Sequence, residues 1–197
     1  TFFFFYPNAM QFEAFDNEDK LLDSRKYYSI GGGKIIREDS NEGLEINEVY
    51  PHHSLTEILQ YLDENGLTFW EYVQEFEHAE IWDYLAEVLA VMKKSVEDGL
   101  NEEGVLPGGL RLRRKAMSYY TKARSYKPSL KGRCLVQSYA LAVSEQNAAG
   151  GLIVTAPTCG SCGVVPAVLY HLSKEHEFTD KQIIRSLATA GLFGSII

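Results

Sequence analysis

A short turn with two thiols and two hydroxyls is the segment of this chain best suited to chemistry. It consists of Thr158, Cys159, Gly160, Ser161 and Cys162, with an apolar run before it and another after it. Because glycine lets the backbone pack tightly, several N–H groups of such a turn can point at one anion. A helix that begins near Ser161 would add the positive end of its dipole. The turn therefore predicts a pocket for a carboxylate or a phosphate.

The two cysteines of the turn leave other roles open. Cys159 and Cys162 have C-x-x-C spacing, which also occurs in thiol oxidoreductases and in zinc or iron sites. Two thiols are half a metal site, and no pair among the five histidines has the spacing of metal ligands. Cys134 lies within an apolar helical pattern, which predicts a packing residue. A redox dithiol, a metal site or simple packing remain alternatives to a substrate pocket.

Capping residues and hydrophobic periodicity predict the helices around this turn. Ser54 and Thr68 each open a capping box, and apolar residues spaced three to four apart continue the helical pattern after them. Small residues in one of the later helices would allow close packing against a neighbour. We expect helices at residues 54–66, 68–77, 81–99, 129–149 and 179–197.

The first fifty residues have strand patterns instead. We expect strands at residues 10–15, 27–30 and 34–37, with a turn at 16–19. The triple glycine 31–33 predicts a bulge or a close backbone approach, because a phosphate loop would need a Lys-Ser/Thr pair and a helix after it. Strands followed by helices predict an α+β protein in two units, 1–50 and 51–197, joined near residues 40–53.

Composition narrows the class of protein further. The 197 residues are 45% hydrophobic and 23% charged, as in a globular protein, and no apolar run reaches the roughly 18 residues that span a bilayer. Three cysteines, two of them in one turn, are typical of free thiols in a reducing compartment. We therefore expect a cytoplasmic protein with no membrane partner.

The net charge of −8 is unevenly distributed. Residues 105–144 contain nine basic and no acidic residues, whereas residues 42–103 contain sixteen acidic ones. The basic stretch indicates either nucleic-acid contact or a solvated loop that neutralises the acidic helices of the same fold. The acidic overall balance favours the second interpretation, so we expect no nucleic-acid partner.

Five segments occur in an order typical of one enzyme family. They are PNAMQFEA at 7–14, YSIGGG at 28–33, EGVLPGGL at 103–110, ALAVSEQNAAGG at 140–151 and VTAPTCGSCGVVPAV at 154–168. They resemble the elements HPNxMxFEA, YSIGGG, EGVLPGGL, ALAVNEENAAGG and VTAPTNGAAGIIPAV of the iron–sulfur-dependent L-serine dehydratases (L-serine ammonia-lyases). The resemblance extends over nearly the whole chain.

This resemblance implies a fragment of a longer enzyme. Residues 1–50 would be the C-terminal part of a small α+β (β-chain-like) domain, and residues 51–197 the N-terminal part of a helical catalytic (α-chain-like) domain. Both ends of the chain are apolar, which also favours a piece of something longer. The partners would be the substrate L-serine, the remainder of the parent chain and, in a homo-oligomer, further copies.

The resemblance also implies a reaction, the conversion of L-serine to pyruvate and ammonia. A [4Fe–4S] cluster with one iron free of cysteine would act as a Lewis acid on the substrate hydroxyl, so no pyridoxal phosphate is needed. The implied substrate-binding residues are Asn8, Thr158, Cys159, Gly160 and Ser161. No residue of the chain is assigned as the catalytic acid or base.

Three departures from the family pattern matter. Cys159-Gly160-Ser161 stands where the family usually has Asn-Gly-Ala, although some similar sequences carry the cysteine form. Tyr6 replaces the histidine of HPN, which removes a hydrogen-bonding or proton-transfer partner. The cluster cysteines of the family belong to motifs such as GAEVGCQGE, which this chain lacks. We therefore expect the isolated chain to bind no cluster and to be inactive, with a thiol oxidoreductase or a helical docking module as alternative functions.

Overall fold

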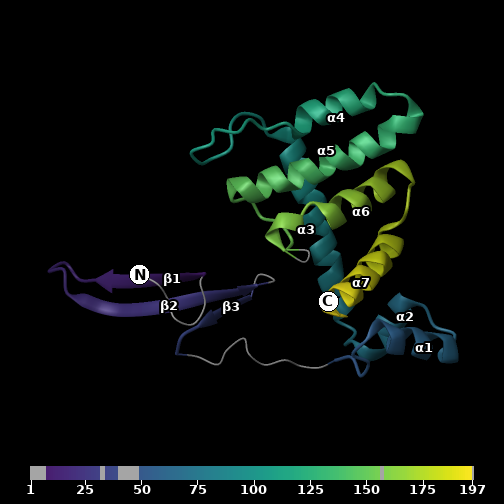
Figure 1. Ribbon diagram of the computed structural model, residues 1–197, viewed down its shortest axis with the longest axis horizontal. Coiled ribbons are helices and arrows are strands. Elements are labelled where there is room, and N and C mark those ends of the chain that lie inside the picture. Colours follow the sequence, from purple (N-terminus) through teal and green to yellow (C-terminus); the bar gives the residue numbers. More distant parts are fainter. Residues whose placement is uncertain (1–7, 32–33, 40–48, 156–157, 197) are drawn as a thin grey trace. The chain divides into compact units, whose positions relative to one another are not determined.

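The computed structural model describes residues 8–31, 34–39, 49–155 and 158–196 (Figure 1). The chain divides into two compact units, Thr1–Glu48 and Val49–Ile197. The first contains a three-stranded sheet and the second contains the helices. This arrangement confirms the predicted α+β fold class.

The sheet is antiparallel, with strand order β1-β2-β3. Its strands are β1 (Ala9–Phe15), β2 (Leu21–Gly31) and β3 (Lys34–Arg37). The turn between β1 and β2 is closed by Asp16, whose carboxylate accepts the N–H groups of Glu18 and Lys20, both at 2.9 Å. The second strand is longer than predicted because its polar first half also pairs with β1.

A register shift interrupts the pairing of β2 and β3 between Ser29 and Gly31. The irregularity lies where the triple glycine predicts a bulge. Gly32 and Gly33 themselves lie outside the described residues, as does Tyr6.

All five helices expected from the sequence are present. They are α1 (Leu55–Asn65), α2 (Phe69–Phe76), α3 (Ile81–Asn101), α5 (Pro128–Ala149) and α7 (Asp180–Ile196). Capping boxes at Ser54 and Thr68 begin α1 and α2, and Gly66 ends α1 with a φ of 65°. These local signals placed both ends of the first two helices to within about one residue.

Two further helices complete the unit, α4 (Ala116–Arg124) and α6 (Val164–Glu175). Helix α4 has no clear apolar face, since only Ala116 and Ala123 of its nine residues are buried. Helix α6 is formed by the apolar run that follows the thiol turn. Within the described ranges, no helix has both the length and the apolar character needed to cross a bilayer.

Helix α3 contacts α4, α5, α6 and α7, and the helical unit has two hydrophobic clusters. One cluster surrounds Tyr72 and Ile183, and the other surrounds Leu135 and Val143. Helices α3 and α5 lie in close contact at Gly99, where an added Cβ would lie 2.3 Å from the carbonyl oxygen of Ala142. The small residues of α5 therefore permit the close packing that the sequence predicted.

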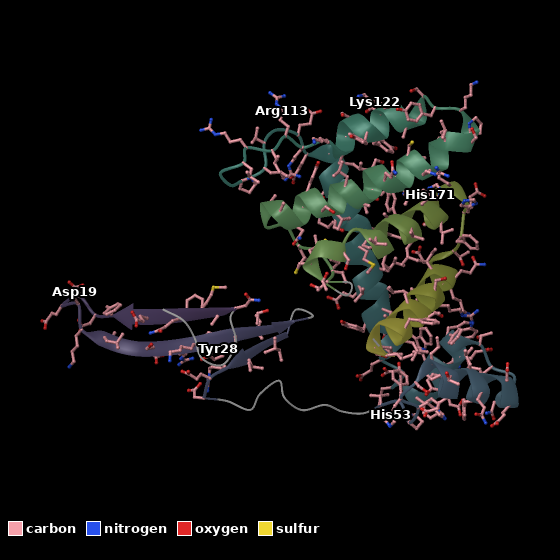
Figure 2. All side chains as sticks on the ribbon, in the orientation of Figure 1. Asp19, Tyr28, His53, Arg113, Lys122 and His171 are labelled. Carbon is pink, nitrogen blue, oxygen red and sulfur yellow. The ribbon has the colours of Figure 1, made fainter. Side chains whose placement is uncertain are left out.

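The connection between α3 and α4 is a long loop that projects from the helical unit (Figure 1). An isolated antiparallel bridge joins Val105 to Arg113, and Leu106 donates its N–H to the carbonyl of Leu112 at 2.8 Å. Figure 2 shows Arg113 on this loop and Lys122 on α4. The expectation of a solvated loop is therefore wrong for much of the basic stretch, because α4 and α5 contain several of its residues. Arg114 differs from its neighbours because it forms an ion pair with Glu102 at 2.6 Å.

Candidate functional site

The thiol turn contains a single turn of 3-10 helix, η1 (Cys159–Ser161), stabilised by Thr158 and Ser161. The Oγ1 of Thr158 accepts the N–H of Ser161, and the Oγ of Ser161 accepts the N–H of Thr158, both at 3.3 Å. The two hydroxyl oxygens lie 3.1 Å apart. The N–H groups of Thr158 and Ser161 are therefore engaged within the turn.

Unlike the N–H groups of Thr158 and Ser161, those of Cys159 and Gly160 are not bonded within the turn. The first N–H groups of a helix have no partner inside it, and these two make no hydrogen bond to any other described residue. Two N–H donors of the turn thus remain for an acceptor such as a carboxylate. The sequence predicts several converging amides, and in the described residues those of Cys159 and Gly160 are the two without a hydrogen-bond partner among residues 158–161.

Helix α5 holds the turn in place at two points. The Nδ2 of Asn147 donates to the carbonyl oxygen of Cys159 at 3.0 Å. Gly163, at the start of α6, lies against α5 so closely that an added Cβ would be 2.4 Å from the carbonyl oxygen of Ala140. Gly160 has more room, since its nearest neighbour would be the Oγ1 of Thr158 at 3.7 Å. The tight packing expected of the turn glycines therefore occurs at Gly163.

The two cysteines of the turn have different environments. Cys159 is exposed, whereas Cys162 is fully buried among residues of α3, α5 and α6. The pKa of the Cys162 thiol is raised, mainly by burial and to a smaller extent by the nearby Cys159. Cys134 is half-buried on α5 and packs against the same cluster. Of the two cysteines in the turn, Cys159 is therefore the one placed to react with a solute.

We expect iodoacetamide at pH 8 to alkylate Cys159 at least about ten times faster than Cys162, because the thiolate is the reactive form and must also be reached. Peptide mapping by mass spectrometry at successive times would measure both rates in one sample. A Cys159→Ser variant should lose the fast phase and keep the slow one. Equal rates for the two thiols would contradict this difference in burial.

The described residues do not fit an iron–sulfur cluster. A [4Fe–4S] cluster is normally held by cysteine thiolates, most often four. No group of three or more His, Cys, Asp or Glu side chains in the described ranges is placed to hold a metal ion. Cys159 and Cys162 alone would supply two thiols, one exposed and one in the core.

Asn8, the remaining residue that the resemblance implies for substrate binding, lies in the sheet unit. It is exposed just before β1, and its carbonyl accepts the N–H of Ser29 at 2.9 Å. It borders an apolar groove that includes Met10, Phe12 and Tyr27. Asn8 belongs to the sheet unit and the thiol turn to the helical unit.

Three consecutive polar residues near the end of α5 were part of a family segment but had no individual role in the sequence interpretation. Glu145 is 4% exposed, and its Oε1 accepts the N–H of Lys115 at 2.6 Å and of Ala116 at 3.3 Å, which caps α4. Gln146 is buried, and its Nε2 has no hydrogen-bond partner among the described residues. Asn147 holds the thiol turn. The sequence signal that could have identified these residues is a Glu-Gln-Asn run within a helix that is otherwise rich in small residues.

Comparison with known proteins identifies the family. Residues 20–197 match the family described as serine dehydratase alpha chain, a match that begins within the sheet unit and covers the helical unit. The chain belongs to this family. This confirms the resemblance found in the five sequence segments.

Curated relatives agree with that assignment. The chain is 35% identical to the L-serine dehydratase of Streptomyces coelicolor over 204 residues, which cover 98% of this chain and 45% of the relative. It is 37% identical to L-serine dehydratase 1 of Escherichia coli K12 over 204 residues, with 97% and 45% covered. For the L-serine dehydratase of Haemophilus influenzae the values are 38% over 210 residues, with 100% and 46% covered. The chain thus spans about half the length of the curated relatives that it matches.

Proposed function

We propose that this chain provides the substrate-carboxylate subsite of an L-serine ammonia-lyase, which converts L-serine to pyruvate and ammonia. The proposal rests on the two uncommitted N–H groups of Cys159 and Gly160, in a turn that Asn147 and Gly163 hold against α5. It is supported by the family match and by relatives named L-serine dehydratase.

In this proposal the turn binds and orients the substrate. The carboxylate of L-serine accepts the N–H groups of Cys159 and Gly160, and charge-assisted hydrogen bonds of this kind are stronger than neutral ones. The hydroxyls of Thr158 and Ser161 lie beside them and limit how the carboxylate can rotate. The overall reaction removes water to give aminoacrylate, which hydrolyses to pyruvate and ammonia.

The proposal includes the wider organisation of the protein. Residues 1–50 would belong to a β-chain-like domain and residues 51–197 to an α-chain-like catalytic domain, with Asn8 contributing to the substrate site from the first. The cluster that the family resemblance implies would need thiolates from outside this chain, because the described residues do not fit it. Three free cysteines are consistent with a cytoplasmic location.

Pyruvate release from L-serine tests the proposal directly. The whole protein, purified without oxygen, should form pyruvate from L-serine, lose this activity in air and recover it with iron and a thiol. The 197-residue chain alone should form none. D-serine serves as the substrate control. A whole protein that is inactive on L-serine under these conditions would contradict the proposed function.

Asn147 provides a sharper test of the turn. In the whole protein, Asn147→Ala should raise the KM for L-serine about tenfold with a smaller change in kcat, because losing one hydrogen bond lets the turn move. Ser144→Ala is a matched control on the same helix, since the Ser144 hydroxyl donates to the carbonyl of Ala140 one turn earlier in α5. Steady-state kinetics and melting temperatures would be measured for both variants. An unchanged KM in a folded Asn147→Ala enzyme would show that Asn147 does not support substrate binding.

The thiol oxidoreductase is supported less well by the structure. A reactive dithiol needs one cysteine with a lowered pKa, usually at a helix N-terminus or beside a positive charge. Burial instead raises the pKa of Cys162.

A further inference from the structure

A groove separate from the thiol turn is lined by residues of α2, α3 and α7. Its volume is about 400 Å³, which is within the range of small-molecule sites. The lining consists of two indole rings, one amide, one aliphatic side chain and two cations. These are Trp70, Gln74, Trp82, Lys181, Ile184 and Arg185.

Helical spacing brings these groups to one surface. Trp70 and Gln74 are four residues apart on α2, and Lys181 and Arg185 are four apart on α7, so each pair shares one face of its helix. The guanidinium carbon of Arg185 lies 3.7 Å from the centroid of the Trp70 ring. The rings of Trp70 and Trp82 meet edge to face, with centroids 6.5 Å apart. The aromatic wall and one cation are thus ordered by contacts within the groove.

Both charged residues that line the groove are positive, in a chain with a net charge of −8. In the part of the chain that the structure describes, neither Lys181 nor Arg185 forms an ion pair. The nearby carboxylate of Glu71 accepts the N–H of Thr68 at 2.9 Å and its hydroxyl at 2.6 Å, and so caps α2. These bonds, and after them the charge of Arg185, lower the pKa of Glu71. Glu71 remains bound to the cap and does not line the groove.

We propose that this groove binds a small carboxylate that carries an aromatic ring. The ring packs against the indoles of Trp70 and Trp82, and the carboxylate lies between Lys181 and Arg185. Indole rings favour flat apolar partners, and the two cations favour an anion. A protein partner would need a far larger surface than these six side chains provide. The proposal does not depend on the lyase function.

Tryptophan fluorescence reports on this groove alone, because the chain contains two tryptophans and both line it. Phenylacetate added to the 197-residue chain should change the emission with saturation. The probe 2-phenylethanol, which lacks the charge, and cyclohexylacetate, which lacks the aromatic ring, should each bind at least about tenfold more weakly.

Charge-neutralising variants locate the carboxylate. Lys181→Gln and Arg185→Gln should each weaken phenylacetate binding about tenfold, whereas Lys122→Gln on α4 should leave it unchanged. Lys181 is exposed, so its variant is expected to fold even if removal of the Arg185–Trp70 contact disturbs the helices.

Three results would overturn the proposal: no saturable change of the fluorescence with phenylacetate, equally tight binding of either control probe, or unchanged phenylacetate affinity in Lys181→Gln. Self-association through the groove without phenylacetate binding would also overturn it, in favour of a second copy of the chain.

Discussion

Replacing Gly99 with alanine is expected to lower the free energy of unfolding of the helical unit by about 3 kcal/mol. The new Cβ would lie 2.3 Å from the carbonyl oxygen of Ala142 and 2.6 Å from its carbon. Both atoms belong to the backbone of α5, so no side-chain rotation can relieve the overlap. The helices α3 and α5 would have to move apart, which would loosen the packing of the buried residues between them.

The measurement is urea denaturation followed by circular dichroism, and α7 offers a matched control. Gly191 is also inside a helix, but a Cβ there would meet no atom within 4 Å. Gly191→Ala should therefore raise stability by about 0.5–1 kcal/mol, the usual helix preference of alanine over glycine. The prediction requires that Gly99→Ala lowers the free energy of unfolding and that Gly191→Ala raises it. If Gly99→Ala also stabilised the chain, the close crossing of α3 and α5 would be wrong.

Replacing Glu145 with alanine should cost about 2–4 kcal/mol of stability. The buried carboxylate accepts the N–H groups of Lys115 and Ala116, and Ala116 is fully buried at the start of α4. Removal of the carboxylate leaves these donors without a partner and also leaves a cavity in α5. Amide hydrogen exchange should therefore become faster in α4 than in the wild type, with a smaller change in α1 and α2.

Two further variants separate the cap from a general effect of charge. Glu145→Gln keeps one acceptor oxygen and should lose roughly half as much stability as Glu145→Ala. Glu87→Ala removes an exposed carboxylate from α3 and should change stability by less than about 0.5 kcal/mol. The role of Glu145 would be refuted if its alanine variant were as stable as Glu87→Ala.

The helix ends show how much of this fold was accessible from the sequence. Ser54 and Thr68 were identified as capping residues, and the structure places both at N-caps with complete capping boxes. Gly66 was expected to end α1 and adopts the left-handed conformation there. These predictions succeed because the interacting groups lie within about four residues of one another, so neighbouring letters contain the information.

The thiol turn shows where that information ends. Thr158 and Ser161 are three residues apart and were considered together, yet their hydroxyls and N–H groups bond one another. Among the described residues, the N–H groups of Cys159 and Gly160 have no such partner. The residue that anchors the turn, Asn147, is twelve positions away from Cys159. No local pattern links the two, because their contact exists only after α5 and the turn have packed.

Helix α4 also depends on a contact that no local sequence pattern predicts, here between residues even further apart in the chain. Its weak apolar face did not predict a helix, and its N-terminus is capped by Glu145, 29 to 30 residues further along the chain. The order of the five expected helices and three strands, the caps at Ser54 and Thr68 and the family follow from the amino-acid sequence, because short-range periodicity and motifs specify them. The pairing of Glu145 with α4, the crossing at Gly99 and the groove of Trp70, Trp82 and Arg185 arise from packing, because each joins atoms that only the folded backbone brings within a few ångströms.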